Sequence, residues 1–236
     1  MYVFLFMACS SDAASQAVPK ISNKGDSSVQ SSKGAAPTVK LNSGFDMPVL
    51  GLGTWTLRGK VAEDAVYVAI KNGYRLIDTA KYYDIDDSLE KLGLEYIDLM
   101  LLHQHGSDAE DKAVFKAMER AVKAKKIRSI GISNYYTEKT AKRFFADFEI
   151  KPAVVQNENH VFYQNTDFKE YAKRYGAVVE SYYPLGGRGH TEDVLGNKVV
   201  AKIAKAHGKS IFDFELTDDE MKQIATLDTG HRYENW

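Results

Sequence analysis

Residues 127–158 read IRSIGISNYYTEKTAKRFFADFEIKPAVVQNE, and this stretch decides the fold class. Two short apolar runs, 127–133 and 153–158, have the length and composition of buried strands. Between them a segment begins at Thr137, carries Glu138 and Lys139 in its first turn, and continues to about Phe148 as an expected helix. A strand, a helix and a strand in this order form a βαβ unit, which predicts parallel strands.

The same alternation extends over the rest of the chain. The run 96–102 is almost continuously apolar, which suits a sheet covered on both faces. A β-hairpin is expected where a polar turn joins two short runs near residue 43. The pattern predicts an α/β fold with a parallel sheet and no second domain. The barrel strands expected are 49–54, 74–79, 96–102, 127–132, 153–158 and 177–183, and the helices are 62–72, 113–125, 137–148, 167–175, 199–207 and 217–227.

Composition excludes several classes of protein. The 236 residues include 31 basic and 32 acidic side chains, for a net charge of -1, so no strong field attracts nucleic acid or an anionic membrane. One cysteine excludes a disulfide framework and a cysteine-based zinc site. No apolar run approaches the ~20 residues of a membrane span. We therefore expect no nucleic-acid partner and no transmembrane helix.

The first 37 residues differ in composition from the rest of the chain. Residues 1–8 read MYVFLFMA and precede Cys9, and the following stretch is mostly Ser, Ala, Gly, Lys and Asp. Such a composition predicts a disordered linker, because it cannot bury enough apolar surface to offset its ordering entropy. The arrangement resembles a bacterial lipoprotein signal in which Cys9 carries the lipid. The alternative is a tail with an inert cysteine. We divide the chain into 1–37, a signal-like segment and linker, and 38–236, the folded domain.

Polar residues follow successive expected strands. Asp78, His103, Ser133, Gln156 and Tyr182 all lie at or near strand ends. Each has a structural explanation on its own, such as capping a turn or filling a core position. In a parallel barrel, however, the carboxyl ends of all strands face one mouth, where substrates bind. Five strands with a functional group at this end predict a site.

Several motifs together resemble the aldo-keto reductases, over residues 39–236. They are GLGTW (51–55), RLIDTAKYY (75–83), LMLLHQ (99–104), IRSIGISNY (127–135), VVQNENH (154–160), SYYPLGG (181–187) and LDTGHRYENW (227–236). The resemblance implies a (β/α)8 barrel of the TIM type with an N-terminal β-hairpin closing its bottom. It also implies an oxidoreductase that reduces aldehydes or ketones to alcohols with NADPH, with NADH as the other candidate cofactor.

The resemblance assigns roles to individual residues. The catalytic residues would be Asp78, Tyr83 and His103, with Tyr83 as the general acid that protonates the carbonyl oxygen and His103 orienting that carbonyl. Trp55 would line the substrate site with Tyr83 and His103. The cofactor-binding residues would be Gly53, Thr54 and Asp78 beside the cofactor, Ser133, Asn134 and Gln156 at the carboxamide, Tyr182 on the nicotinamide ring, and Leu185 and Gly186 over the pyrophosphate.

The chain also departs from the family pattern in two places. The family's catalytic lysine follows a helix and strand after the tyrosine, and residues 84–89 (DIDDSL) instead lead towards the next motif. Lys81, two residues before Tyr83, has poor spacing for that role. After 208–210 the eighth strand and the basic loop that grips the cofactor's adenosine phosphate are also missing. The barrel is therefore expected to be incomplete, with about six recognisable strands.

Two other functions stay open. The first is a catalytically inactive relative that keeps the scaffold for binding or regulation. The second is a metal-dependent hydrolase, because His103 and His105 form an HxH pair with Asp78 and His160 as possible neighbours. The main interpretation assigns no metal. It predicts a monomer with a small-molecule aldehyde or ketone as its partner, located in the cytoplasm, or anchored at the cell envelope if Cys9 is lipidated.

Overall fold

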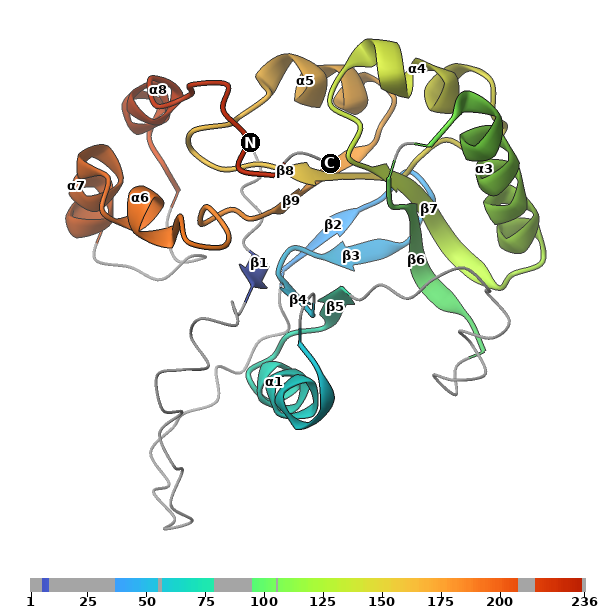
Figure 1. The fold of residues 1–236 in the computed structure, drawn as a ribbon, viewed down its shortest axis with the longest axis horizontal. Coiled ribbons are helices and arrows are strands. Elements are labelled where there is room, and N and C mark those ends of the chain that lie inside the picture. The colour runs from blue at the N-terminus through green and yellow to red at the C-terminus, as the bar shows by residue number, and fades with distance from the viewer. Residues whose placement is uncertain are drawn as a thin grey trace.

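The computed structural model describes residues 6–8, 37–54, 57–78, 95–104, 106–207 and 215–234 (Figure 1). Its strands are β1 (Phe6–Ala8), β2 (Thr38–Lys40), β3 (Asp46–Pro48), β4 (Gly51–Gly53), β5 (Leu76–Asp78), β6 (Ile97–Leu102), β7 (Ile127–Ser133), β8 (Val154–Glu158) and β9 (Val178–Tyr182). Its helices are α1 (Gly59–Lys71), α3 (Asp108–Lys123), α4 (Glu138–Ala146), α5 (Thr166–Arg174), α6 (Thr191–Leu195), α7 (Lys198–His207) and α8 (Asp218–Ala225).

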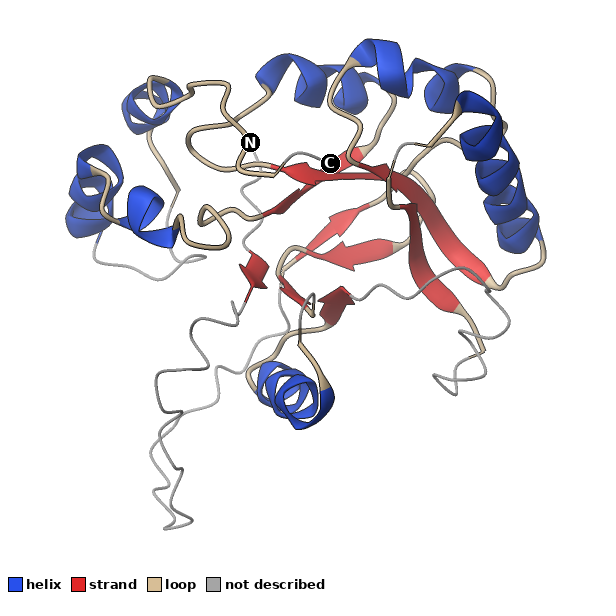
Figure 2. Cartoon of the chain, viewed as in Figure 1, coloured by secondary structure: helices blue, strands red, loops and turns tan. Residues whose placement is uncertain are grey.

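The best-packed part is a parallel sheet in the order β6-β7-β8-β9. Helices α3, α4 and α5 cover its outer face (Figure 2). An aromatic cluster fills this interface: the Phe115 ring lies 5.0 Å from Phe144 and 4.7 Å from Phe148, in edge-to-face geometry. Burial of these rings on one face and of apolar residues on the other gives the covered sheet that the sequence predicts.

A second group of strands completes the architecture. Strands β1, β4 and β5 form a parallel sheet, and β2 pairs with β3 as an antiparallel hairpin whose turn contains Gly44 at φ 90°. All six expected barrel strands are present as β4 to β9. Within the described residues, no strand pairing joins β5 to β6 or β9 to the three-stranded sheet. The expected α/β barrel architecture with an N-terminal hairpin is confirmed, with the described barrel strands in two sheets and the hairpin in a third.

Several boundaries differ from the sequence prediction. Helix α3 begins five residues earlier than expected, because Ser107 and Glu110 form a reciprocal capping box. Helix α6 was not expected at all. Phe6–Ala8, placed by sequence in the signal-like segment, forms a strand that pairs in parallel with Gly51–Gly53. Local capping accounts for the early start of α3 and long-range pairing for β1, and hydrophobic periodicity encodes neither.

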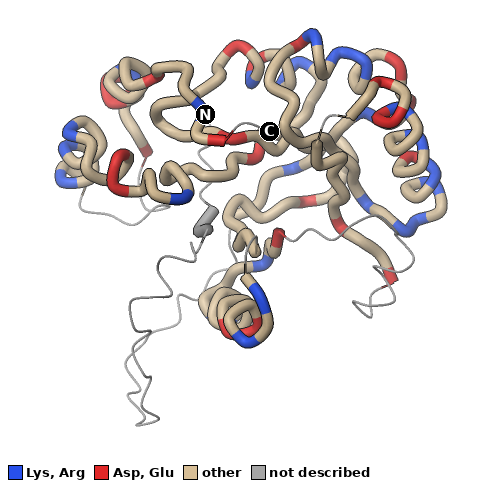
Figure 3. Tube along the Cα trace, in the orientation of Figure 1, with Lys and Arg blue, Asp and Glu red and all other residues tan. Residues whose placement is uncertain are grey.

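The charged side chains are distributed over the outer helices. Both basic and acidic positions occur along each of α3, α4 and α5 (Figure 3). No helix among the described residues has the length and apolar character needed to cross a membrane.

A glycine on β7 allows β7 and β8 to approach closely, and this is testable. A Cβ on Gly131 would lie 2.3 Å from the backbone oxygen of Val154. We expect Gly131→Ala to lower the free energy of unfolding by about 1–3 kcal/mol, measured by urea denaturation. Gly106→Ala is the matched control, because the atoms nearest to its Cβ belong to side chains, Glu110 at 3.2 Å and Asp111 at 3.4 Å, and not to the backbone. Equal stabilities for the two variants would contradict this packing.

Candidate active site

Strand register places polar side chains from neighbouring strands in one row. Ser133 on β7 pairs with Gln156 on β8, and Gln156 pairs with Glu180 on β9. On β6, Leu102 pairs with Ile132, so His103 follows at the level of Ser133. Parallel strands in register therefore bring His103, Ser133 and Gln156 together, as the sequence predicts.

Asp78, at the end of β5 in the other sheet, lies next to this row of polar side chains. Gln156 Nε2 lies 3.5 Å from Asp78 Oδ2. The backbone oxygen of Asp78 accepts hydrogen bonds from Thr54 N at 2.9 Å and from Thr54 Oγ1 at 2.8 Å. Burial raises the pKa of the Asp78 carboxyl, and the nearby His103 and Gln156 oppose that shift. Gly53 pairs with Asp78 in register, so the residues expected beside the cofactor share this corner.

The segment after β7 is fixed by its own hydrogen bonds. Ser133 Oγ donates to the backbone oxygen of Gln156 at 2.8 Å, and Asn134 Nδ2 donates to the backbone oxygen of His103 at 2.8 Å. Asn134 has φ 65°, a left-handed conformation that Asn tolerates better than most residues. Backbone strain at non-glycine residues is found most often at functional sites.

Tyr182 joins this corner through its hydroxyl. It donates to Asn134 Oδ1 at 2.7 Å and lies 2.7 Å from the hydroxyl of Tyr136. The Tyr136 hydroxyl in turn donates to Asn134 Oδ1 at 3.0 Å. Sequence reasoning placed Tyr182 and Asn134 in the site but missed Tyr136, because its contacts arise only when β7 and β9 come together.

The loop after β9 has a tight turn at Gly186. Its φ is 88°, and a Cβ at this position would lie 2.5 Å from the backbone oxygen of His190. Gly186 N donates to the backbone oxygen of Tyr183 at 2.8 Å. Only glycine fits here, because any side chain would collide with the backbone of His190 and would need a positive φ.

Some expected residues lie outside the described residues. They are Trp55 and Tyr83 of the substrate site, together with Lys81, Cys9 and His105. The proposed meeting of Tyr83 with Asp78 and His103 therefore stays a prediction, of which the structure places Asp78 and His103.

Glu180 is a site residue that sequence reasoning missed. It is 2% exposed, and its Oε2 has no hydrogen-bond partner. Burial raises its pKa to about 8, and the nearby Asp78 carboxyl adds to the shift. The sequence contained a signal, since a glutamate interrupts the apolar run before Tyr182.

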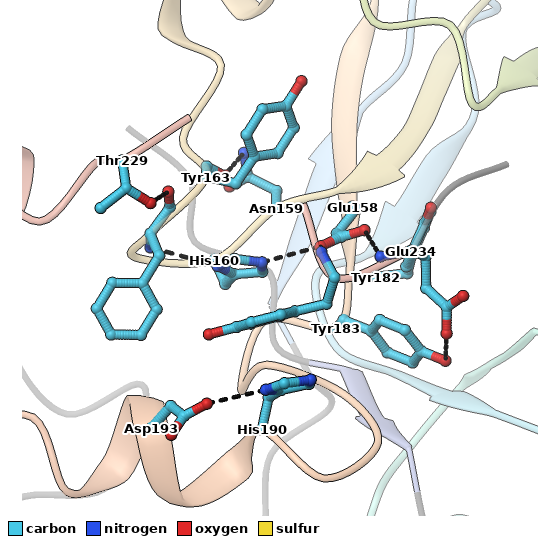
Figure 4. Close-up of polar contacts among 12 residues, drawn as sticks. Glu158, Asn159, His160, Tyr163, Tyr182, Tyr183, His190, Asp193, Thr229 and Glu234 are labelled. Carbon is cyan, nitrogen blue, oxygen red and sulfur yellow. Dashed lines mark hydrogen bonds and ion pairs between the residues drawn. The ribbon is translucent and has the colours of Figure 1, made fainter. Parts of the chain in front are cut away.

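A second buried carboxylate, Glu158, holds the C-terminal tail (Figure 4). It accepts hydrogen bonds from Tyr233 N at 2.5 Å and Glu234 N at 3.0 Å, and His160 Nε2 lies 3.0 Å from its Oε1. Tyr233 stacks between the rings of His160 and His190, at 4.7 and 3.8 Å. His160, considered as a metal neighbour, is thus part of a tail clamp. No group of three or more potential metal ligands occurs within the described ranges.

Comparison with known proteins identifies the family. The model of the Aldo/keto reductase family matches residues 84–227. The chain belongs to this family.

Similar proteins extend the match beyond that range. Glyoxal reductase of Bacillus subtilis is 31% identical over 265 residues, covering 83% of this chain and 94% of the relative. NAD(P)H-dependent D-xylose reductase I,II of Candida tropicalis is 27% identical over 305 residues, covering 84% and 94%. A solved aldo-keto reductase from a Medee basin deep-sea metagenome library superposes with a TM-score of 0.77 at 26% identity, covering 84% and 97%. The fold of this aldo-keto reductase chain is accordingly that of the family's (β/α)8 barrel, of which the structure describes six barrel strands, β4 to β9.

The buried Glu180 carboxyl should make the free energy of unfolding depend on pH. Between about pH 4.5 and 8 the folded chain keeps a proton on Glu180 that the unfolded chain has released, so this group lowers stability as pH rises. Glu180→Gln carries no titrating group at this position. We therefore expect its free energy of unfolding, relative to that of the wild type, to rise by on the order of 3 kcal/mol from pH 5 to pH 8. Urea denaturation at both pH values measures this.

The exposed Glu149, paired with Lys123 at 2.5 Å, provides the control. Glu149→Gln should shift stability by the same small amount at both pH values. A Glu180→Gln difference that does not change with pH would contradict the assignment of a buried, protonated carboxyl.

Proposed function

We propose that this aldo-keto reductase is an NAD(P)H-dependent oxidoreductase that reduces small aldehydes or ketones to alcohols. The observation that carries the proposal is the convergence of Asp78, His103, Ser133 and Gln156 from separate strands. Family membership and the carbonyl-acting relatives support it. The partner is a small-molecule carbonyl compound, and we propose a monomer.

The chain's residues fit a nicotinamide dinucleotide, with NADPH as our first choice and NADH as the other. The xylose reductase of Candida tropicalis is named for use of either. Tyr182 offers a flat, partly exposed ring beside Asn134 for the nicotinamide. Ser133, Asn134 and Gln156 would hold the carboxamide, and Gly53 and Thr54 would border it. When bound, the cofactor supplies a hydride.

The remaining chemistry falls to side chains of this chain. Tyr83 would give its hydroxyl proton to the carbonyl oxygen as the alcohol forms, and His103 would orient that oxygen. Trp55 would form the substrate wall. A free tyrosine has a pKa near 10, so Tyr83 needs a neighbouring cation to act efficiently near neutral pH.

That cation is the weak point of the site. Glu180 is buried and Asp78 is partly buried, and neither has an ion pair with a lysine or arginine among the described residues. The alignment with the Bacillus subtilis relative runs over 265 residues, more than the 236 of this chain, so the relative contains segments with no counterpart here. This supports the interpretation that the lysine-bearing strand and the basic phosphate loop are missing.

We therefore expect slow turnover and weak cofactor binding. Loss of assisted proton transfer removes about 10²–10⁴-fold in rate. Loss of two charge-assisted bonds to the cofactor phosphate weakens affinity by roughly two to four orders of magnitude. NADPH fluorescence titration and a carbonyl-reduction assay measure both.

The matched control for this assay is Tyr83→Phe, which removes the proposed acid and should abolish the residual reduction without changing NADPH affinity. Micromolar or tighter affinity with ordinary turnover would contradict the proposed impairment and point to a replacement cation such as Lys81. Cofactor binding with no reduction would favour the alternative function, an inactive relative that acts by binding.

Localisation has its own test. A nicotinamide-dependent reductase needs the cellular cofactor pool, so we propose the cytoplasm, with a lipid anchor at Cys9 as the alternative. In cells fed labelled fatty acid, we expect no label in the protein. Label that disappears in Cys9→Ala would instead establish the envelope anchor, and Cys9→Ser serves as a second variant with the same lost thiol.

A further inference from the structure

The C-terminal tail holds Arg232 in a fixed place. Before it, Thr229 N and Oγ1 donate to the backbone oxygen of Phe162 at 2.9 and 3.1 Å. After it, the backbone amides of Tyr233 and Glu234 donate to the buried Glu158 carboxylate (Figure 4). Anchors on both sides leave the arginine backbone little freedom.

The guanidinium of Arg232 lies at the edge of the candidate active site. Its Cζ is 4.0 Å from the centroid of the Tyr136 ring, a cation–π contact. The hydroxyl of that same Tyr136 lies 2.7 Å from the Tyr182 hydroxyl and donates to Asn134. The cation is therefore separated by a single tyrosine from the residues proposed to hold the nicotinamide.

Arg232 lacks a carboxylate partner in the described part of the chain. Three other arginines there have an acidic oxygen close by: Arg128 pairs with Asp98 at 2.8 Å, Arg143 with Asp108 at 2.6 Å and Arg188 with Glu234 at 3.5 Å. Nη1 of Arg232 is instead buried with no hydrogen-bond partner.

The groups around this guanidinium are phenols. Tyr136, Tyr163 and Tyr182 are its electrostatic neighbours, and burial raises the pKa of both Tyr163 and Tyr182, which keeps them uncharged. A partly buried cation with an unused donor is costly unless an anion completes it. Its planar donor fork matches the two oxygens of a carboxylate or phosphate.

We propose that Arg232 binds an oxyanion, a carboxylate or a phosphate, at the rim of the nicotinamide site. The inference rests on the proposed function only for the identity of the molecule that carries this group. Two sources share the chemistry: a phosphate of the cofactor, which would offset the missing basic loop, or an acidic group on the carbonyl substrate.

The first experiment tests anion binding without turnover. Calorimetric titration of the full chain with inorganic pyrophosphate and with benzoate should show binding of at least one. Arg232→Gln should weaken it at least about tenfold, since charge-assisted bonds are lost. Arg128→Gln is the matched control, because Arg128 also lies over a tyrosine ring, Tyr96, at 3.7 Å but at the opposite end of β7. It should bind as the wild type does.

The second experiment distinguishes the sources. A tenfold rise in the NADPH dissociation constant of Arg232→Gln assigns the cofactor phosphate. A rise in KM for 4-carboxybenzaldehyde but not for 4-methylbenzaldehyde, with NADPH affinity unchanged, assigns a substrate carboxylate. If the wild type neither binds NADPH nor reduces any aldehyde, the proposed function fails, and the anion titrations still decide the role of Arg232.

Two results would overturn the proposal: a wild-type chain that binds neither anion, or an Arg232→Gln variant that binds them as tightly. Circular dichroism checks that the variant is folded. Should it unfold, Arg232→Lys keeps the charge and loses the planar fork, and undiminished anion binding by that folded variant would equally reject recognition by the guanidinium.

Discussion

In-register parallel pairing of β7, β8 and β9 is the constraint on which the candidate site depends. It sets Ser133, Gln156 and Glu180 side by side, although about 24 residues separate each from the next along the chain. A shift of one residue on any strand would turn its polar side chain towards the opposite face. The aromatic packing beneath α3 and α4 fixes this register, because the apolar face of each strand must stay covered.

The two buried glutamates show how the environment separates structural from reactive carboxylates. Burial raises the pKa of Glu158, but hydrogen bonds from His160 and from two tail amides outweigh it and hold that pKa below its usual value. Glu180 has an oxygen without a partner and faces Asp78, so its pKa rises. Glu158 consequently anchors the tail as an anion, whereas Glu180 costs stability near neutral pH. A buried carboxyl that lowers stability is most readily retained where a functional site requires it.

Acidic and basic side chains without an ion-pair partner lie around the same part of the candidate site. Asp78 and Glu180 have no lysine or arginine partner, and Arg232 has no carboxylate partner, among the residues that the structure describes. Tyr136 and Tyr182 lie beside Arg232, and Asn134 ties them to His103. This pattern is typical of a binding site whose ligands complete its electrostatics, in contrast to the outer helices, where exposed charges pair with one another.

The sequence by itself determined the hairpin, the family and the order of the strands and helices apart from β1 and α6. It also placed His103, Ser133, Asn134 and Gln156 at strand ends. These features follow from local periodicity and from motifs that each occupy a short stretch of chain. Only the tertiary structure decided the roles of Glu180, Tyr136 and Arg232. These roles depend on partners that are absent or that lie far away in the sequence. Whether a carboxylate is paired, or a guanidinium lies over a ring, depends on segments brought together by sheet register and by the clamped tail, and no local pattern encodes that.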